Sequence, residues 1–345
     1  ADVDHVAEIF QTPLSGSYNW DYDVQDDRIK KLYDLGKQLN WDPEMDIDWD
    51  RPWPTEERAP EMMILHDYEP YLAMDEKTKD EFWLHMNAWS LSQFLHGEQG
   101  ALLVASQLCS CAPTLNAKLY AASQTFDEAR HVEVFSQYLD QKLGGIKYPV
   151  NTHLGSLLDD IIQDSRWDMT YLGMQIMVEG LALAAFGFMQ QTTEEPLLKK
   201  LLRYVMADEA RHVAFGILSL QELYEDMDAA EFRVRQEFAY EACNMMRRRT
   251  LNSELWPSFG ISNAEIEALL PSQESQQRMQ HLLFSKIVPN CKKLGLLDLR
   301  DGWLRERFQE MGIIQYENWE NTAEDLTIGD AVEPILTDAA GPVTS

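Results

Sequence analysis

A five-residue motif that occurs twice constrains the fold of this chain more than any other feature. Residues 127–131 read Asp-Glu-Ala-Arg-His, and residues 208–212 repeat the same five letters. In a helix, residues three positions apart lie on one side, so each copy would direct its Glu and its His to one point. The repeat extends backwards, since Glu98 and Glu179 each lie 30 residues before the Glu of their own copy. Two copies of one helix pair would therefore bring four carboxylates and two imidazoles together.

Glu98 and Glu179 interrupt helix faces that are otherwise apolar. Apolar residues flank each of them at three- and four-residue spacing. An unpaired carboxylate is costly at a buried position, and four such groups would repel one another. Two divalent cations would cancel this charge. The sequence therefore predicts a di-metal site with the ligands Glu98, Glu128, His131, Glu179, Glu209 and His212.

This ligand set indicates which metals the site would hold. It is rich in oxygen and offers one imidazole per metal, which suits iron or manganese and disfavours structural zinc. We expect Glu128 and Glu209 to bridge or chelate between the two metals, with positions left open for O2 and a substrate. The remaining ligands would complete one metal each, Glu98 with His131 and Glu179 with His212.

Asp127 and Asp208 directly precede the two bridging glutamates. A ligating imidazole commonly donates its second N–H to a carboxylate. We expect each Asp to hold the His of the opposite copy, so that Asp127 pairs with His212 and Asp208 with His131. The alternative for both is a solvated acid. The arginines of the two motifs, Arg130 and Arg211, are as consistent with surface ion pairs as with contacts behind the ligands.

Helical periodicity dominates the chain and strand signals are nearly absent, which predicts an all-α fold. Pro113, the pair Gly144-Gly145 and Pro196 mark helix ends or starts. The predicted long helices span about 75–111, 114–143, 166–191 and 196–225, and further helices are expected at 27–39, 154–163, 229–252 and 273–294.

The chain divides into three predicted segments. Residues 1–60 would form an irregular, aromatic-rich N-terminal strap, because tryptophans and prolines are spread along a poorly periodic stretch. Residues 61–300 would form the helical domain that contains the di-metal site. Residues 301–345 would form an acidic C-terminal extension, which we expect to be loosely attached from about Asn321.

Charge and cysteine content restrict the partners and the compartment. With 29 basic and 58 acidic residues, the net charge of −29 argues against nucleic acid or an anionic membrane as a partner. The chain begins without the basic and apolar regions of a signal peptide. The cysteines form no CxxC pair, which indicates reduced thiols and a cytoplasmic protein. They are Cys109, Cys111, Cys243 and Cys291.

The most apolar stretch, residues 171–189, has about the length of a membrane span. Gln175 and Glu179 interrupt it, and an ionised Glu in the middle of a span is unfavourable. We therefore expect a helix that is buried on all sides inside the bundle.

The paired Asp-Glu-x-Arg-His motifs resemble those of the ferritin-like di-iron carboxylate oxygenases and oxidases. This group includes acyl-carrier-protein desaturases, multicomponent monooxygenase hydroxylases, arylamine N-oxygenases and the ribonucleotide reductase radical subunit. The resemblance covers about residues 75–225 and implies a ferritin-like four-helix bundle with additional helices. It also implies a di-iron oxidoreductase of monooxygenase type that uses two Fe ions (or Mn/Fe or Mn) and O2 as co-substrate. An electron donor protein, such as a ferredoxin or reductase, and a homodimeric assembly are implied as well.

Three positions depart from individual subfamilies of this group. Phe135 stands where the ribonucleotide reductase radical subunit has a Tyr, and Val205 stands where arylamine N-oxygenases add a third His. Ala182 and Leu183 occupy the positions near the metals at which hydroxylases and desaturases have a Thr. The chain is therefore expected to form a separate branch of the oxygenase group.

Residues one helical turn from the ligands would line a substrate pocket, with core packing as the alternative for each. A largely apolar lining predicts a small, apolar organic substrate that is hydroxylated, desaturated or N-oxygenated. A ferritin- or rubrerythrin-like protein that handles iron or reduces peroxide is the alternative function, and an interaction protein with a vestigial site is a third. The predicted pocket residues are Leu102, Gln124, Phe135, Gln175, Leu183, Phe186 and Val205, with Leu95 and Phe215 nearby.

Overall fold

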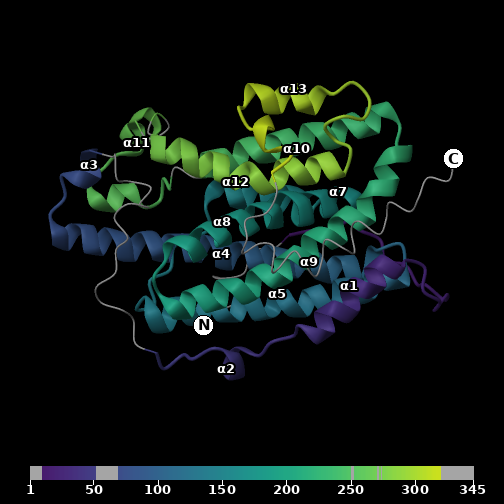
Figure 1. Cartoon of the computed structure of the whole chain (residues 1–345), viewed down its shortest axis with the longest axis horizontal. Coiled ribbons are helices and arrows are strands. Elements are labelled where there is room, and N and C mark those ends of the chain that lie inside the picture. Colours follow the sequence, from purple (N-terminus) through teal and green to yellow (C-terminus); the bar gives the residue numbers. More distant parts are fainter. Residues whose placement is uncertain (1–9, 52–68, 250–251, 270–271, 273, 320–345) are drawn as a thin grey trace.

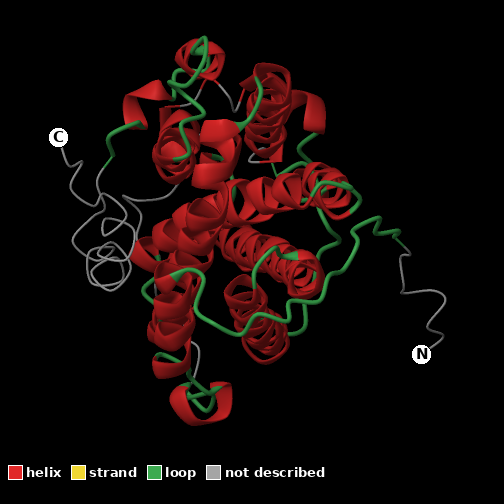
Figure 2. Ribbon diagram, turned by 90° about the vertical axis from the view of Figure 1, so that its right-hand side faces the viewer, coloured by secondary structure: helices red, strands yellow, loops and turns green. Residues whose placement is uncertain are grey.

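The structure is a computed structural model that describes residues 10–51, 69–249, 252–269, 272 and 274–319. Within these residues the chain forms helices and no strand, which confirms the predicted all-α class. Figure 2 shows helices packed around one another and joined by loops.

Four long helical segments in the described part of the chain form a bundle (Figure 1). The first two pack along each other, and so do the last two. The third is interrupted by a π-helical stretch and therefore carries three labels. The segments are α4 (Glu76–Cys111), α5 (Leu115–Lys142), α7–η3–α8 (Trp167–Tyr171, Leu172–Val178, Glu179–Thr192) and α9 (Pro196–Asp226).

Side-chain caps fix the starts of these helices close to the predicted bounds. The Asp75 carboxylate accepts a hydrogen bond from the Thr78 N–H, and the Thr114 hydroxyl accepts one from the Ala117 N–H. Glu195 caps α9 in the same way, with Pro at the first helical position. At the end of α5, the glycines 144 and 145 have φ values of 65° and 77°, a left-handed conformation that stops a helix.

The π-helical stretch η3 lies directly before Glu179. The sequence predicted one uninterrupted helix here, because its apolar pattern is compatible with ordinary helical periodicity. All seven residues of η3 are buried. A π turn contains more residues than an α turn, so it changes the direction in which the following side chain points, and such turns are frequent at functional sites.

Further helices cover the bundle (Figure 1). α12 and α10 pack against the α8–η3 segment, α13 packs on α10, and α6 lies against α4. The third bundle segment is therefore enclosed by protein. The bounds are α1 Asp27–Gln38, α2 Pro43–Asp46, α3 Glu69–Leu72, α6 Thr152–Ile162, α10 Ala229–Arg249, η4 Trp256–Phe259, α11 Asn263–Leu269, α12 Glu274–Lys293, α13 Trp303–Glu310 and η6 Ile314–Tyr316.

This enclosed segment is the apolar stretch noted in the sequence. Among the described residues, Trp167–Thr192 is the one helix long and apolar enough to cross a membrane, with a mean hydropathy of 1.6. The bundle buries 67% of its most apolar window. Core helices of soluble proteins have the same length and composition, so this property is weak evidence for a membrane span.

The N-terminal segment contributes to the bundle. The predicted helix at 27–39 is α1, which packs against α5 and α9. The buried Trp41 follows it. At the other end, α13 and η6 pack against α10 and α12. The predicted division into strap, domain and extension stays a prediction, and the tail expected from Asn321 lies outside the described residues.

Gly216 permits close packing between α9 and η3. A Cβ added there would lie 2.5 Å from the Gln175 Cβ and 3.2 Å from the Ile176 Cδ1. Because the Gln175 Cβ is attached to the backbone, the two helices would have to separate. Gly216→Ala is expected to lower the free energy of unfolding by about 1–3 kcal/mol, measured by denaturant titration. As a control, Gly155→Ala in α6 meets its nearest atom at 3.7 Å and should be neutral or stabilising; equal effects of both changes would contradict this interpretation.

Candidate metal centre

The four bundle segments bring the six predicted ligands together in the interior. Glu98 comes from α4, the first motif from α5, Glu179 from the start of α8 and the second motif from α9. Every one of the six side chains is buried. Their ligand atoms form two groups, each with all atoms within 4.8 Å of one another. The first group is Glu98, Glu128, His131 and Glu209, and the second is Glu128, Glu179, Glu209 and His212.

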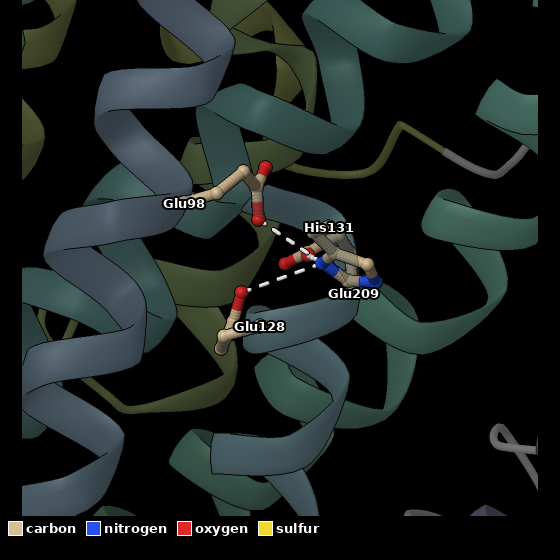
Figure 3. Close-up of side chains that lie close together, drawn as sticks. All are labelled: Glu98, Glu128, His131 and Glu209. Atoms are coloured by element: carbon tan, nitrogen blue, oxygen red, sulfur yellow. Dashed lines mark hydrogen bonds and ion pairs between the residues drawn. The ribbon is translucent and has the colours of Figure 1, made fainter. Parts of the chain in front are cut away.

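The first group converges on the Nδ1 atom of His131 (Figure 3). This nitrogen lies 3.0 Å from the Glu98 Oε2, 3.1 Å from the Glu209 Oε1 and 3.4 Å from the Glu128 Oε2. Nδ1 is therefore the atom of His131 that faces the carboxylates, and it is the atom that would bind a metal.

The second group repeats this arrangement around the Nδ1 of His212. The distances are 3.1 Å to the Glu128 Oε1, 3.4 Å to the Glu209 Oε2 and 4.0 Å to the Glu179 Oε2. Glu128 and Glu209 thus present one oxygen to each imidazole. This is the arrangement that two carboxylates need in order to bridge two metals.

Unpartnered polar atoms show that the cluster suits a pair of cations. Buried polar atoms are nearly always hydrogen-bonded in folded proteins. Here the Glu128 Oε2, the Glu179 Oε2, both carboxylate oxygens of Glu209 and the His212 Nδ1 have no hydrogen-bond partner among the described residues. All five atoms belong to the predicted ligands. Oxygen donors and one imidazole per group are a donor set that iron or manganese accepts.

The other nitrogen of each imidazole contacts an aspartate from the opposite motif. His131 Nε2 lies 3.0 Å from the Asp208 Oδ2, and His212 Nε2 lies 3.3 Å from the Asp127 Oδ2. These are the pairs that the sequence predicted. In a neutral imidazole, an N–H donated to a carboxylate from Nε2 leaves Nδ1 unprotonated and able to bind a metal.

The two motif arginines are buried and bridge these aspartates. Arg130 NH2 lies 2.6 Å from Asp127 and 2.9 Å from Asp208. Arg211 NH2 lies 2.5 Å from Asp208 and 3.3 Å from Asp127. We call these four residues the Asp–Arg layer. Their opposite charges balance, and the layer lies behind both histidines. The sequence was consistent with either surface ion pairs or contacts behind the ligands for Arg130 and Arg211. The structure shows the contacts behind the ligands.

Trp41 also touches this layer, and no motif or spacing in the sequence indicates this contact. Its indole N–H donates to the Asp208 Oδ2 at 2.8 Å, across 167 residues of chain. The ring stacks on Tyr204 with centroids 5.0 Å apart, and the Arg130 guanidinium lies 4.6 Å from the ring centroid. The segment that follows α1 thus reaches the surroundings of the site.

The concentrated charge shifts the pKa values of the cluster. Burial and the charge of Glu209 raise the pKa of Glu98 and of Glu179 well above the ordinary value. Although burial opposes its charge, the two imidazoles hold the pKa of Glu128 well below the ordinary value. Burial likewise opposes charge on the imidazoles, but the surrounding carboxylates raise their pKa. The cluster therefore retains protons without metal, and binding of cations must release them.

Gln124 and Gln175 lie among the ligands. The Gln124 amide donates to the Glu179 Oε1 at 2.8 Å and to the Glu128 Oε1 at 3.2 Å. Gln175 donates to the Gln124 carbonyl oxygen at 3.3 Å. The sequence placed both in the substrate pocket. In the structure Gln124 holds two of the predicted ligand carboxylates, and Gln175 holds Gln124.

A cavity adjoins the ligands between α4 and α8, and it differs from the predicted pocket. The free space in it is small, about 30 Å³ for the centre of a water-sized molecule. Of the predicted lining, the cavity is bordered by Phe186 and not by Leu102, Gln124, Phe135, Gln175, Leu183 or Val205. The prediction selected residues one helical turn from the ligands on all four segments. In the structure two of these residues, Phe135 and Val205, are instead packed in the core. The cavity is lined instead by Gln93, Phe94, Gly97, Ala101, Ala182 and Phe186, among others.

Comparison with known proteins is consistent with this site. A family model described as p-aminobenzoate N-oxygenase AurF matches residues 23–295. No curated protein matches the chain.

Two similar solved structures are an R2-like ligand-binding oxidase variant with an anaerobically reconstituted Mn/Fe cofactor and an R2-like ligand-binding oxidase with an aerobically reconstituted metal cofactor after photoconversion. Their sequence identities are 19% and 17%, and their TM-scores are 0.57 and 0.56. Each alignment covers 79% of this chain and 94% of the other. These likenesses confirm the predicted ferritin-like fold. The family match covers most of the chain, so this protein belongs to the p-aminobenzoate N-oxygenase family, and the prediction of a di-iron oxygenase or oxidase is confirmed.

Proposed function

We propose that this chain uses two redox-active metal ions and O2 to N-oxygenate a small, largely apolar arylamine. The observation that carries the proposal is the pair of ligand groups that share Glu128 and Glu209 beside a cavity. The family description supports nitrogen as the position that is oxidised. One turnover would convert an amine, O2, two electrons and two protons into a hydroxylamine and water.

We propose the ligand roles as the sequence predicted them, with iron or an Mn/Fe pair as the metals. When bound, these metals supply electrons and the position at which O2 is activated. Glu128 and Glu209 belong to both ligand groups and would hold both ions, and Gln124 orients Glu128 and Glu179 by hydrogen bonds. The Asp–Arg layer holds both imidazoles with Nδ1 toward the carboxylates. The buried surroundings keep bulk water from the ligands.

The two electrons require a donor, and we propose that a ferredoxin or a reductase supplies them. We also propose that the enzyme is cytoplasmic and homodimeric. Free Cys109, Cys111, Cys243 and Cys291 are consistent with a reducing compartment. The net charge of −29 favours a donor that presents basic residues at its contact surface.

An isotope experiment tests the reaction. Protein loaded anaerobically with Fe(II) is mixed with aniline and ¹⁸O2, and the products are identified by mass spectrometry. The Fe(II) ions supply the two electrons of a single turnover. We expect an N-oxygenated aniline that carries ¹⁸O, and protein loaded with redox-inert Zn(II) should give none. Oxidation of iron without a labelled organic product would instead support the iron-handling alternative, and label on a ring carbon would contradict N-oxygenation.

A further inference from the structure

The charges around the cavity determine which substrates can enter it. Its described lining includes the carboxylates Glu98, Glu179 and Glu209, and it includes no Lys, Arg or His. Apart from Gln93, the other lining residues are apolar or small. A bound anion would therefore find no cationic side chain in the described part of the cavity.

Gln93 is the one uncharged polar side chain in this lining, and its amide group is already occupied. Its NH2 donates to the Pro149 carbonyl oxygen at 2.9 Å, and its Oε1 accepts from the Asn151 N–H at 2.7 Å. The side chain is 1% exposed. Gln93 thus fixes the loop before α6 and has little capacity left to bind a carboxylate.

The buried guanidinium groups near the site are also occupied. Arg130 and Arg211 bind Asp127 and Asp208 in the Asp–Arg layer, and neither arginine lines the cavity. Two divalent cations would neutralise the four ligand carboxylates and leave no surplus positive charge. An anionic substrate would then be buried without compensation, which is strongly unfavourable.

Aromatic and small side chains border the apolar part of the cavity. Phe94 and Phe186 meet edge to face with centroids 4.7 Å apart, and both line the cavity. Gly97, Ala101 and Ala182 leave room beside them, and a Cβ added at Gly97 would meet no atom within 4 Å. An aromatic substrate that enters beside the ligands would contact these phenylalanine rings.

We propose that the cavity accepts uncharged arylamines and excludes the p-aminobenzoate anion, so that the substrate is a neutral aniline, or an ester or amide of aminobenzoic acid. This inference rests on the proposed function for the amine. It departs from the family description, in which the substrate carries a carboxylate.

Binding to Zn(II)-loaded protein tests the inference separately from turnover. Calorimetry with methyl p-aminobenzoate and with p-aminobenzoate at neutral pH compares two ligands that differ mainly in charge. We expect the ester to bind at least about 100-fold more tightly than the anion. Equal or tighter binding of the anion, or no binding of either ligand, would overturn the inference. Failure of N-oxygenation despite selective binding would overturn the proposed reaction only.

A charge introduced at Gly97 gives a second test. Gly97→Lys would place an ammonium group at the cavity and should reduce the preference for the ester at least about tenfold. Gly97→Met fills a similar space without charge and should leave the preference intact. If both variants change the ratio of the two dissociation constants equally, space and not charge determines selectivity, and the inference is wrong.

Discussion

Replacing Glu209 by Gln is expected to remove both metal ions, whereas replacing Glu98 by Gln should remove only one. The physical reason is that Glu209 belongs to both ligand groups and Glu98 to one. A neutral amide neither bridges two cations nor offsets their charge. We expect affinity at each affected position to fall by more than about 100-fold. Metal content per chain after anaerobic loading, measured by elemental analysis, separates the two outcomes.

Glu133→Gln is the matched control for these variants. Glu133 is exposed and lies on α5, the same helix as Glu128. This variant should bind two metal ions, as the unchanged chain does. If Glu209→Gln kept one metal, the carboxylate would serve a single position, and the proposed bridging role would be wrong.

The repeat made the ligand cluster predictable from the sequence. Each motif fixes two candidate ligands on one helix face by spacing alone, and the constant 30-residue interval adds Glu98 and Glu179. Burial of four carboxylates then requires neutralisation, whatever the details of packing. The aspartate–histidine contacts followed from the same symmetry, because each motif supplies one partner to the other.

Features that depend on packing between distant segments could not be predicted in this way. Trp41 reaches Asp208 across 167 residues, and no periodicity connects them. The burial of Arg130 and Arg211 depends on how closely α5 and α9 approach. A helical pattern of apolar residues also does not distinguish a π turn from an α turn, so η3 was missed.

The position of the cavity was the least predictable property of the site. Proximity to a ligand in the sequence places a residue within one turn of the metals, but it does not decide whether neighbouring helices fill the space. Phe135 and Val205 are fully covered by packing, while the small residues Gly97 and Ala101 leave a gap. A cavity arises where side chains are absent, and amphipathic patterns report only where apolar side chains are present.

The Asp–Arg layer is expected to stabilise the fold as well as orient the imidazoles, and Asp208→Ala tests both roles. Asp208 is 1% exposed and contacts His131, Arg130, Arg211 and Trp41. Its loss leaves two buried guanidinium groups with the single carboxylate of Asp127, so the free energy of unfolding should fall by about 3–5 kcal/mol. Denaturant titration of the metal-free protein isolates this effect from metal binding.

Two further measurements separate the roles of Asp208. Asp140→Ala removes an exposed partner of Lys147 and should change the free energy of unfolding by less than about 1 kcal/mol. Asp208→Asn keeps the shape of the side chain but loses its charge, so its metal affinity should fall about 10- to 100-fold if the carboxylate holds His131 Nε2–H. The Asp208 carboxylate contacts both the arginines and the His131 imidazole. A single substitution of Asp208 should therefore lower both the free energy of unfolding and the metal affinity. Unchanged metal content in a destabilised Asp208→Ala protein would show that the layer supports the fold and does not position the ligand.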